Sequence, residues 1–388
     1  MDYGKIIPEK VSSLKPSGIR KFFELVQGSK DTVSLTIGEP DFITPWHIRV
    51  AGIDSLERGK TYYTSNSGTT ELRQAISEYL SRRFSLSYDP LSEIIVTVGG
   101  SEAIDLTMRA MVAPGDEVII PQPSFVCYEP ICRLCGGVPV IINTKEENQF
   151  KLTAGELRAA ITDKTKLLVL PFPNNPTGAI MEKADLEAVA EVLRGTDIMV
   201  LSDEIYGELT YDADHVSAAS VDGMRERTVL ASGFSKAYAM TGWRLGYIAA
   251  PAEIAPQLLK IHQFAIMCAP TTSQFAAVEA MRNGDTDVEM MRREYNRRRR
   301  YLVGGLRAMG IDCYMPRGAF YVFPNISQFG MSSEQFCQRL LREQGVAIVP
   351  GNAFGESGEG FARISYAYSV EHISLALDRI EAFVKSLS

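Results

Sequence analysis

The chain has 388 residues, 45% of them hydrophobic and 22% charged, a balance typical of a globular protein with a sizeable core. This length favours one large and one smaller domain over a single unit. The formal net charge of −7 argues against nucleic acid as a partner, and no segment of the sequence is long and apolar enough to cross a bilayer.

Three short patterns bear on location and on metal or nucleic-acid sites. The N-terminal residues have no apolar stretch typical of a secretion signal, which predicts a cytoplasmic protein. Cys132 and Cys135 form a C-x-x-C without a second pair, so we predict thiols that line the core and no metal site. The basic run 297–300 follows a helical pattern and predicts the solvated face of a long helix.

The first ninety residues alternate between helical patterns and turns. Residues 16–27 read as a short amphipathic helix, and 33–42 read as a strand that runs into a turn. Gly38 in that turn leaves room for a ligand to approach the backbone. A helix follows over 45–58, and Thr69 marks the start of another.

From residue 93 onward, apolar strand patterns alternate with helical ones, which predicts an α/β fold with a mostly parallel, seven-stranded sheet. Ligands of such sheets lie at the carboxyl ends of the strands. The predicted strands are 94–98, 117–121, 138–142, 167–171, 198–202, 228–231 and 245–250.

The C-terminal third has a different pattern, typical of a smaller α+β domain. Its predicted elements are a helix over about 286–309, a strand hairpin within 311–324, strands at 345–351 and 360–366, and a helix from about 370.

Polar groups suited to an anion follow the first strand of the predicted sheet. Gly100, Ser101 and Glu102 open a helix, where free backbone N–H groups and the positive end of the helix dipole favour a phosphate. The segment is not a G-x-G-x-x-G fingerprint, which disfavours a dinucleotide. After the second strand, Phe125 can stack on a flat ring, and Tyr128 is the alternative.

Polar side chains also lie after, at the end of, or within three more predicted strands. Asn175 precedes a proline and is held extended, with its amide free to donate to a ligand. Asp203 is a carboxylate at the end of a buried run, where such groups need a partner, and Tyr206 follows three residues later. Arg363 lies in an apolar strand and needs an anion, for which a substrate α-carboxylate is suited.

The segment 231–246 combines one lysine with small residues, hydroxyls and an arginine. Lys236 can form a Schiff base with an aldehyde if its amine is partly neutral. Ser235 and Arg244 can hold a phosphate, and Ser232 is a further candidate donor. An aldehyde that also carries a phosphate is pyridoxal 5′-phosphate.

These motifs together resemble the class I and II aminotransferases of the fold-type I pyridoxal-phosphate superfamily, over essentially the whole chain. Their order is most similar to the N-acetyl-diaminopimelate or aromatic amino-acid aminotransferase-like group. Relatives often carry a serine three residues before the lysine, where this chain has Gly233. The resemblance implies a large domain over 46–285 and a small domain made of 1–45 and 286–388.

The resemblance also implies a role for each candidate side chain that meets the cofactor. Lys236 would hold pyridoxal phosphate as a Schiff base and move the proton. Asp203 would pair with the pyridine nitrogen, while Asn175 and Tyr206 would donate to the phenolic oxygen. Phe125 would cover the ring.

For the substrate and the partner subunit, the resemblance implies three further contacts. Arg363, Asn175 and the backbone near Gly38 would bind the substrate carboxylate. Tyr63 would reach the phosphate of the partner in a homodimer with shared active sites, and Tyr62 is an equally placed alternative. The expected reaction is ping-pong transfer of an amino group from an L-amino acid to a 2-oxo acid.

Three other functions are weighed against this one. A β-C–S lyase of the same fold shares every cofactor motif and is the main alternative. An effector-sensing domain of a transcription regulator is disfavoured because no winged-helix segment precedes the motifs. The segment around Lys236 and the absence of a dinucleotide fingerprint disfavour a nicotinamide dehydrogenase.

Overall fold

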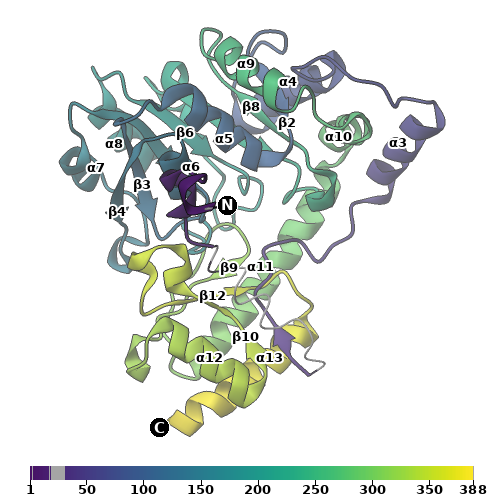
Figure 1. Cartoon of the computed structure of the whole chain (residues 1–388). Helices are drawn as coiled ribbons and strands as arrows, with labels where there is room; N and C mark the ends of the chain where they lie inside the picture. The colour runs from purple at the N-terminus through teal and green to yellow at the C-terminus, as the bar shows by residue number, and fades with distance from the viewer. Residues whose placement is uncertain (2, 17, 19–30, 388) are drawn as a thin grey trace.

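The computed structural model describes residues 1, 3–16, 18 and 31–387, so the helix predicted over 16–27 lies almost wholly outside the described residues. Figure 1 shows a large sheet covered by helices above, and a smaller group of helices and short strands below. Helix α11 (Asp285–Ala308) runs from the upper group into the lower one.

The large sheet has seven strands in the order β2-β8-β7-β6-β5-β3-β4. β8 is antiparallel to both its neighbours and the remaining pairs are parallel, which confirms the mostly parallel α/β sheet. The strands are rich in Val, Ile and Leu because helices cover both faces. They are β2 (Ile94–Thr97), β3 (Glu117–Gln122), β4 (Val138–Asn143), β5 (Thr165–Leu170), β6 (Met199–Asp203), β7 (Thr228–Gly233) and β8 (Gly246–Ala249).

Successive strand residues belong to different clusters of buried side chains, since they point to opposite faces of the sheet. Ile119 packs in the cluster that includes α7 and α8, whereas Val118 and Ile120 pack in the one that includes α5, α6 and α9. Thr69 begins α4 as predicted, because its hydroxyl accepts the N–H of Leu72 (3.3 Å). The helices are α1 (Glu9–Ser12), α3 (Trp46–Glu57), α4 (Thr70–Phe84), α5 (Gly99–Met111), α6 (Tyr128–Leu134), α7 (Ala154–Ala160), α8 (Lys183–Leu193), α9 (Ala255–Ala265) and α10 (Thr271–Asn283).

The lower group combines the segment around β1 (Val33–Ser34) with the C-terminal part of the chain, whereas α1 packs on α6 of the upper group. β1 pairs in parallel with β10 (Val346–Ala347), and β11 (Val349–Pro350) pairs with β12 (Ala362–Ser365). The strand predicted over 345–351 is therefore divided between two sheets. Helices α12 (Ser333–Gln344) and α13 (Val370–Leu387) cover these strands.

The strand hairpin predicted within 311–324 is mostly wrong. Only β9 (Tyr321–Val322) is a strand, with one isolated bridge between Cys313 and Pro324. The backbone N–H groups of Arg317 and Gly318 instead donate to the carbonyl of Gly178 (2.9 Å each). This loop therefore packs on the turn that carries Asn175, rather than forming a second strand.

The prediction that 297–300 is a solvated helix face is wrong for two of its four arginines. Arg298 is 6% exposed and donates to Asp41 (2.8 Å), while Arg299 is 1% exposed and donates to the carbonyl of Pro316 (2.6 Å) and to Asp212. Buried guanidinium groups of this kind require partners, and these two fasten α11 to loops of both groups.

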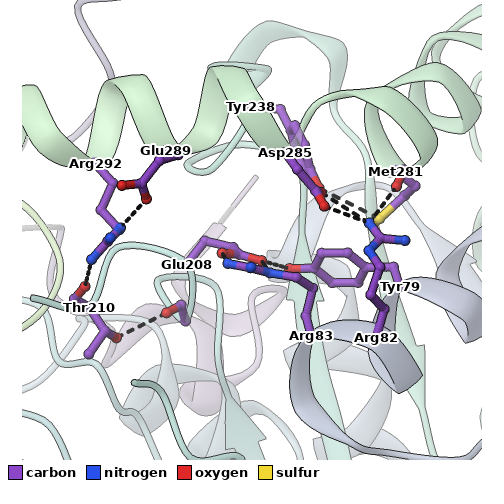
Figure 2. A network of polar contacts seen from close by, with 11 residues as sticks. Tyr79, Arg82, Arg83, Glu208, Thr210, Tyr238, Met281, Asp285, Glu289 and Arg292 are labelled. Carbon is purple, nitrogen blue, oxygen red and sulfur yellow. Dashed lines mark hydrogen bonds and ion pairs between the residues drawn. The ribbon is translucent and has the colours of Figure 1, made fainter. Parts of the chain in front are cut away.

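A partly buried network of polar contacts after β6 holds the segment that follows Asp203. Figure 2 shows Tyr79 and Arg83 of α4 directed at Glu208, whose carboxylate accepts hydrogen bonds from the Tyr79 hydroxyl (2.7 Å) and from two Arg83 nitrogens (2.9 and 2.6 Å). Arg292 of α11 donates to the carbonyl of Thr210 (3.2 Å). The segment 203–210 is thus held from two sides.

Within the described part of the chain, no helix combines the length and the apolar character needed to span a membrane. The same residues contain no group of three or more His, Cys, Asp or Glu side chains arranged to hold a metal ion.

Candidate active site

The predicted polar side chains meet in one cavity of about 340 Å³ at the carboxyl ends of the parallel strands. β9 and β12 of the lower group close its other wall. Eleven of the candidate residues line it, namely Gly38, Gly100, Ser101, Phe125, Asn175, Asp203, Tyr206, Ser235, Lys236, Arg244 and Arg363. The role of each residue in binding or catalysis is a prediction from the sequence.

Lys236 projects into this cavity from the segment that follows β7. Its Nζ donates to the carbonyl of Gly38 (2.5 Å) and lies 5.7 Å from the centre of the Tyr206 ring. The pKa of Lys236 is lowered to about 8, chiefly by burial and also by the positive charges of Arg363 and Arg244, while Glu39 opposes the decrease. About a tenth of the amine is therefore neutral at pH 7, enough for it to act as a nucleophile or base.

Asp203 ends β6 and is buried beside the cavity. Its carboxylate accepts the Tyr128 hydroxyl (2.7 Å) and the backbone N–H of Ile205 (3.2 Å). Burial raises the pKa of Asp203, and these two bonds oppose the rise. Tyr128 therefore has a polar role that the sequence analysis missed, since it considered only ring stacking at this position.

Replacing Tyr128 by phenylalanine is expected to lower the catalytic rate about 10- to 100-fold, because a hydrogen bond to a charged group contributes roughly 1.5–3 kcal/mol. The pKa of Asp203, already raised by burial, rises further when this donor is lost. The acid limb of the pH profile of kcat/KM should then move to higher pH. A lower rate with an unmoved acid limb would contradict this account.

Tyr206 and Tyr321 are a second polar pair in the cavity wall. Their hydroxyls lie 2.8 Å apart, and burial raises the pKa of each. The Tyr321 ring also lies under the guanidinium of Arg363, 4.4 Å from its Cζ. Tyr321 could not be recognised from the sequence, because the aromatic residues around it match a packing pattern equally well.

Arg363 of β12 is 2% exposed and is oriented by neutral groups. It donates to Asn175 Oδ1 (3.0 Å) and to the carbonyl of Thr36 (2.6 Å), while its Nε is buried without a partner. Among the residues described, none of the carboxylates forms an ion pair with it. A buried cation with an unused donor is suited to a carboxylate from outside the chain.

The opposite end of the cavity lies at the N-terminus of α5. Arg244 has φ of 51°, and its guanidinium packs so closely on Gly99 that a Cβ there would lie 2.6 Å from Nη2. Gly233 stands where relatives often have a serine. A Cβ at this position would lie 2.9 Å from the Cα of Gly246 in the neighbouring strand. Ser235 is buried beside this end of the cavity.

Four candidates do not line this cavity. The Glu102 carboxylate accepts the N–H of Val98 and contacts His262, so only its backbone remains available to a phosphate. Ser232 donates to the carbonyl of Glu204 (3.3 Å) instead. Tyr62 and Tyr63 are 59% and 76% exposed and do not line the cavity of their own chain.

The fold and the cavity together point to a class of enzyme that acts on carboxylate-bearing substrates through a reactive amine. Residues 30–380 match the family described as aminotransferase class I and II, and the chain belongs to that family. It is therefore an aminotransferase that depends on pyridoxal phosphate and uses an amino acid and a 2-oxo acid as substrates.

Individual relatives agree with this family. The chain is 52% identical to a putative aminotransferase, YugH, of Bacillus subtilis, over 97% of this chain and 98% of the relative. It is 46% identical to a probable N-acetyl-LL-diaminopimelate aminotransferase of the same organism, over 98% and 96%. The solved aromatic aminotransferase of Pyrococcus horikoshii superposes with a TM-score of 0.90 at 44% identity, covering 95% and 99%. None of these findings favours the β-C–S lyase.

The residues of the cavity fit the cofactor of this family. A lysine with a lowered pKa, a buried aspartate and the glycine-lined start of α5 lie around one space. These groups complement an aldehyde, a basic ring nitrogen and a phosphate respectively.

Proposed function

We propose that the chain transfers the amino group of an L-amino acid by a ping-pong reaction in which Lys236 both holds the cofactor and moves the proton from the substrate Cα. Bound pyridoxal phosphate supplies an aldehyde for the amino group and a ring that stabilises negative charge at Cα. The observation that carries the proposal is a neutralisable Lys236 amine in the same cavity as Asp203 and the buried Arg363.

Each remaining side chain has a holding or orienting role in this proposal. Asp203, oriented by Tyr128, keeps the ring nitrogen protonated, and Asn175 and Tyr206 donate to the phenolic oxygen. Phe125 covers the ring. The phosphate is held by the backbone of Gly100 and Ser101 and by the side chains of Ser235 and Arg244.

Arg363 binds the α-carboxylate of the substrate in this proposal, with Asn175 and the backbone at Gly38 beside it. The wall that remains for the side chain is largely apolar and aromatic, and includes Ile104, Ile205 and Tyr321. This lining and the names of two relatives support a donor of the aromatic or N-acetyl-diaminopimelate type, while the aspartate aminotransferases among the relatives make an acidic donor the alternative that the panel must test.

A panel of amino donors tests this function. Aromatic, acidic and N-acetylated diamino donors are mixed with the holoenzyme, and the change in cofactor absorbance is followed. Amino-group transfer that depends on a 2-oxo acid is expected. Release of pyruvate and ammonia from cystathionine without a 2-oxo acid would instead identify a β-C–S lyase.

We also propose a homodimer with shared active sites. An apolar stripe on the outer face of α3, formed by Trp46, Val50 and Ile53, is 40–62% exposed. Figure 1 shows α3 at the edge of the molecule. The exposed Tyr62 and Tyr63 follow α3 in the sequence. An exposed apolar surface of this kind is typical of a subunit interface.

A hybrid of two inactive variants tests whether Tyr63 serves the partner. Tyr63→Ala and Lys236→Ala are each expected to be nearly inactive as homodimers. In a hybrid dimer, a trans arrangement places both lesions in one site and leaves the other intact, so activity should recover to about half. No recovery in proven hybrids would mean that Tyr63 acts in its own subunit or that Tyr62 is the residue that crosses.

We also propose two domains and a cytoplasmic location. The proposed large domain is 46–285 and the small one is 1–45 with 286–388; the pairing of β1 with β10 supports this division, whereas α1 contacts α6 of the large domain. Structures with and without a bound carboxylic acid would test whether the two domains move separately.

A cytoplasmic location agrees with six unpaired cysteines and can be tested by cell fractionation.

A further inference from the structure

Glu102 and His262 form a buried pair behind the phosphate-binding end of α5. The Glu102 Oε2 accepts the backbone N–H of Val98 (2.5 Å), and its Oε1 lies 2.6 Å from Nδ1 of His262. His262 comes from α9, which packs beside α5 (Figure 1). The His262 side chain is fully buried and that of Glu102 is 9% exposed. The carboxylate therefore faces away from the cavity and into the protein.

The bond to Val98 closes the turn that begins α5. Val98 is the residue immediately before the helix, and Gly99, Gly100 and Ser101 lie between it and Glu102 in the sequence. A Cβ on Gly246 of β8 would lie 2.7 Å from the N of Gly100, so the turn already packs tightly on the sheet. The same turn touches the Arg244 guanidinium through Gly99. Its conformation therefore sets how the backbone N–H groups and Arg244 lie relative to one another.

A carboxylate at this place has an electrostatic disadvantage. A negative side chain in the first turn stabilises the helix, but it also repels a phosphate at the same helix end. The hydrogen bonds that the Glu102 carboxylate accepts from Val98 and His262 offset this repulsion. Nε2 of His262 is buried without a partner among the described residues, and a neutral ring with its proton on Nδ1 leaves no donor unpaired.

His262 also connects the pair to the loop that carries the two tyrosines. Its carbonyl accepts the backbone N–H groups of Ile266 and Met267 at the end of α9 (2.8 and 3.1 Å). The Met267 carbonyl in turn accepts the side chain of Asn66 (2.7 Å). His262 is thus linked both to the turn proposed to hold the phosphate of its own subunit and to the loop whose Tyr63 is proposed to reach the phosphate of the partner.

We propose that Glu102 and His262 are positioning residues for the cofactor phosphate, which hold the turn 98–101 in its anion-binding conformation without touching the cofactor. The inference rests on the proposed phosphate site at α5. It assigns Glu102 a role through Val98 and His262, in place of the direct phosphate contact expected for it from the sequence.

The test compares binding of pyridoxal phosphate and of pyridoxal, which lacks the phosphate, to the cofactor-free protein. For Glu102→Ala and His262→Leu, the affinity for pyridoxal phosphate should fall about tenfold or more, as the loss of a charged hydrogen bond implies. The affinity for pyridoxal should change little. His262→Asn, whose amide can replace Nδ1–H, should restore most of the lost affinity.

Asp105→Asn is the matched control, because Asp105 lies on α5 but pairs with the exposed Arg109. It should leave both affinities unchanged. If Glu102→Ala does not fold, Glu102→Gln keeps the size and replaces it. An unchanged preference for pyridoxal phosphate, or an equal loss for both compounds, would overturn the inference. A wild-type protein without any such preference would instead overturn the proposed phosphate site.

Discussion

Replacing Lys236 by alanine is expected to lower the rate of amino-group transfer by about 10²- to 10⁴-fold or more, the range that a positioned general base contributes. The Lys236 amine lies at the Gly38 carbonyl with a pKa lowered to about 8. It is therefore the group in this cavity best placed to accept and return a proton near neutral pH. Single-turnover measurement of the donor half-reaction checks this, because it excludes product release.

Lys236→Arg is the control for charge. Arginine keeps the positive charge but does not lose its proton at accessible pH, so it cannot act as a base or nucleophile. We expect it to be as inactive as the alanine variant. A Lys236→Arg protein that keeps most of its activity would show that Lys236 contributes only charge.

Replacing Arg363 by alanine is expected to lower kcat/KM by about 10²- to 10⁴-fold. Two charge-assisted hydrogen bonds to a carboxylate are lost, at roughly 1.5–3 kcal/mol each. All amino donors share the α-carboxylate, so the loss should be similar for aromatic, acidic and small donors. Steady-state kinetics with one donor of each kind measures this.

Arg363→Lys separates charge from geometry. Lysine keeps the charge but cannot form the planar two-pronged contact, so an intermediate loss is expected for every donor. A defect confined to acidic donors would place Arg363 at the side-chain end of the substrate and contradict the assignment.

Much of this site could be predicted because parallel strands bring distant residues to one edge of a sheet. Asn175, Asp203 and Lys236 each follow an apolar run, and the alternation of strands and helices implied that these runs are parallel neighbours. The local signals were strong, since a carboxylate or a cation next to a buried strand needs a partner.

The partners themselves could not be predicted, since they depend on side-chain directions between separate elements. Tyr128 was seen as an aromatic ring, yet its hydroxyl is what reaches Asp203. Glu102 was assigned by its place at a helix start, and its turn toward His262 depends on the packing of α9 on α5. The burial of Arg298 and Arg299 could not be predicted for the same reason, since their partners lie in loops outside α11.

Borohydride reduction of the holoenzyme, followed by peptide mass analysis, tests the central claim most directly. Reduction makes a bond between the cofactor and its lysine permanent. The account predicts a pyridoxyl mass on the peptide that contains Lys236, and none on that peptide in Lys236→Ala. Label on another lysine, or no label on a cofactor-loaded protein, would contradict it.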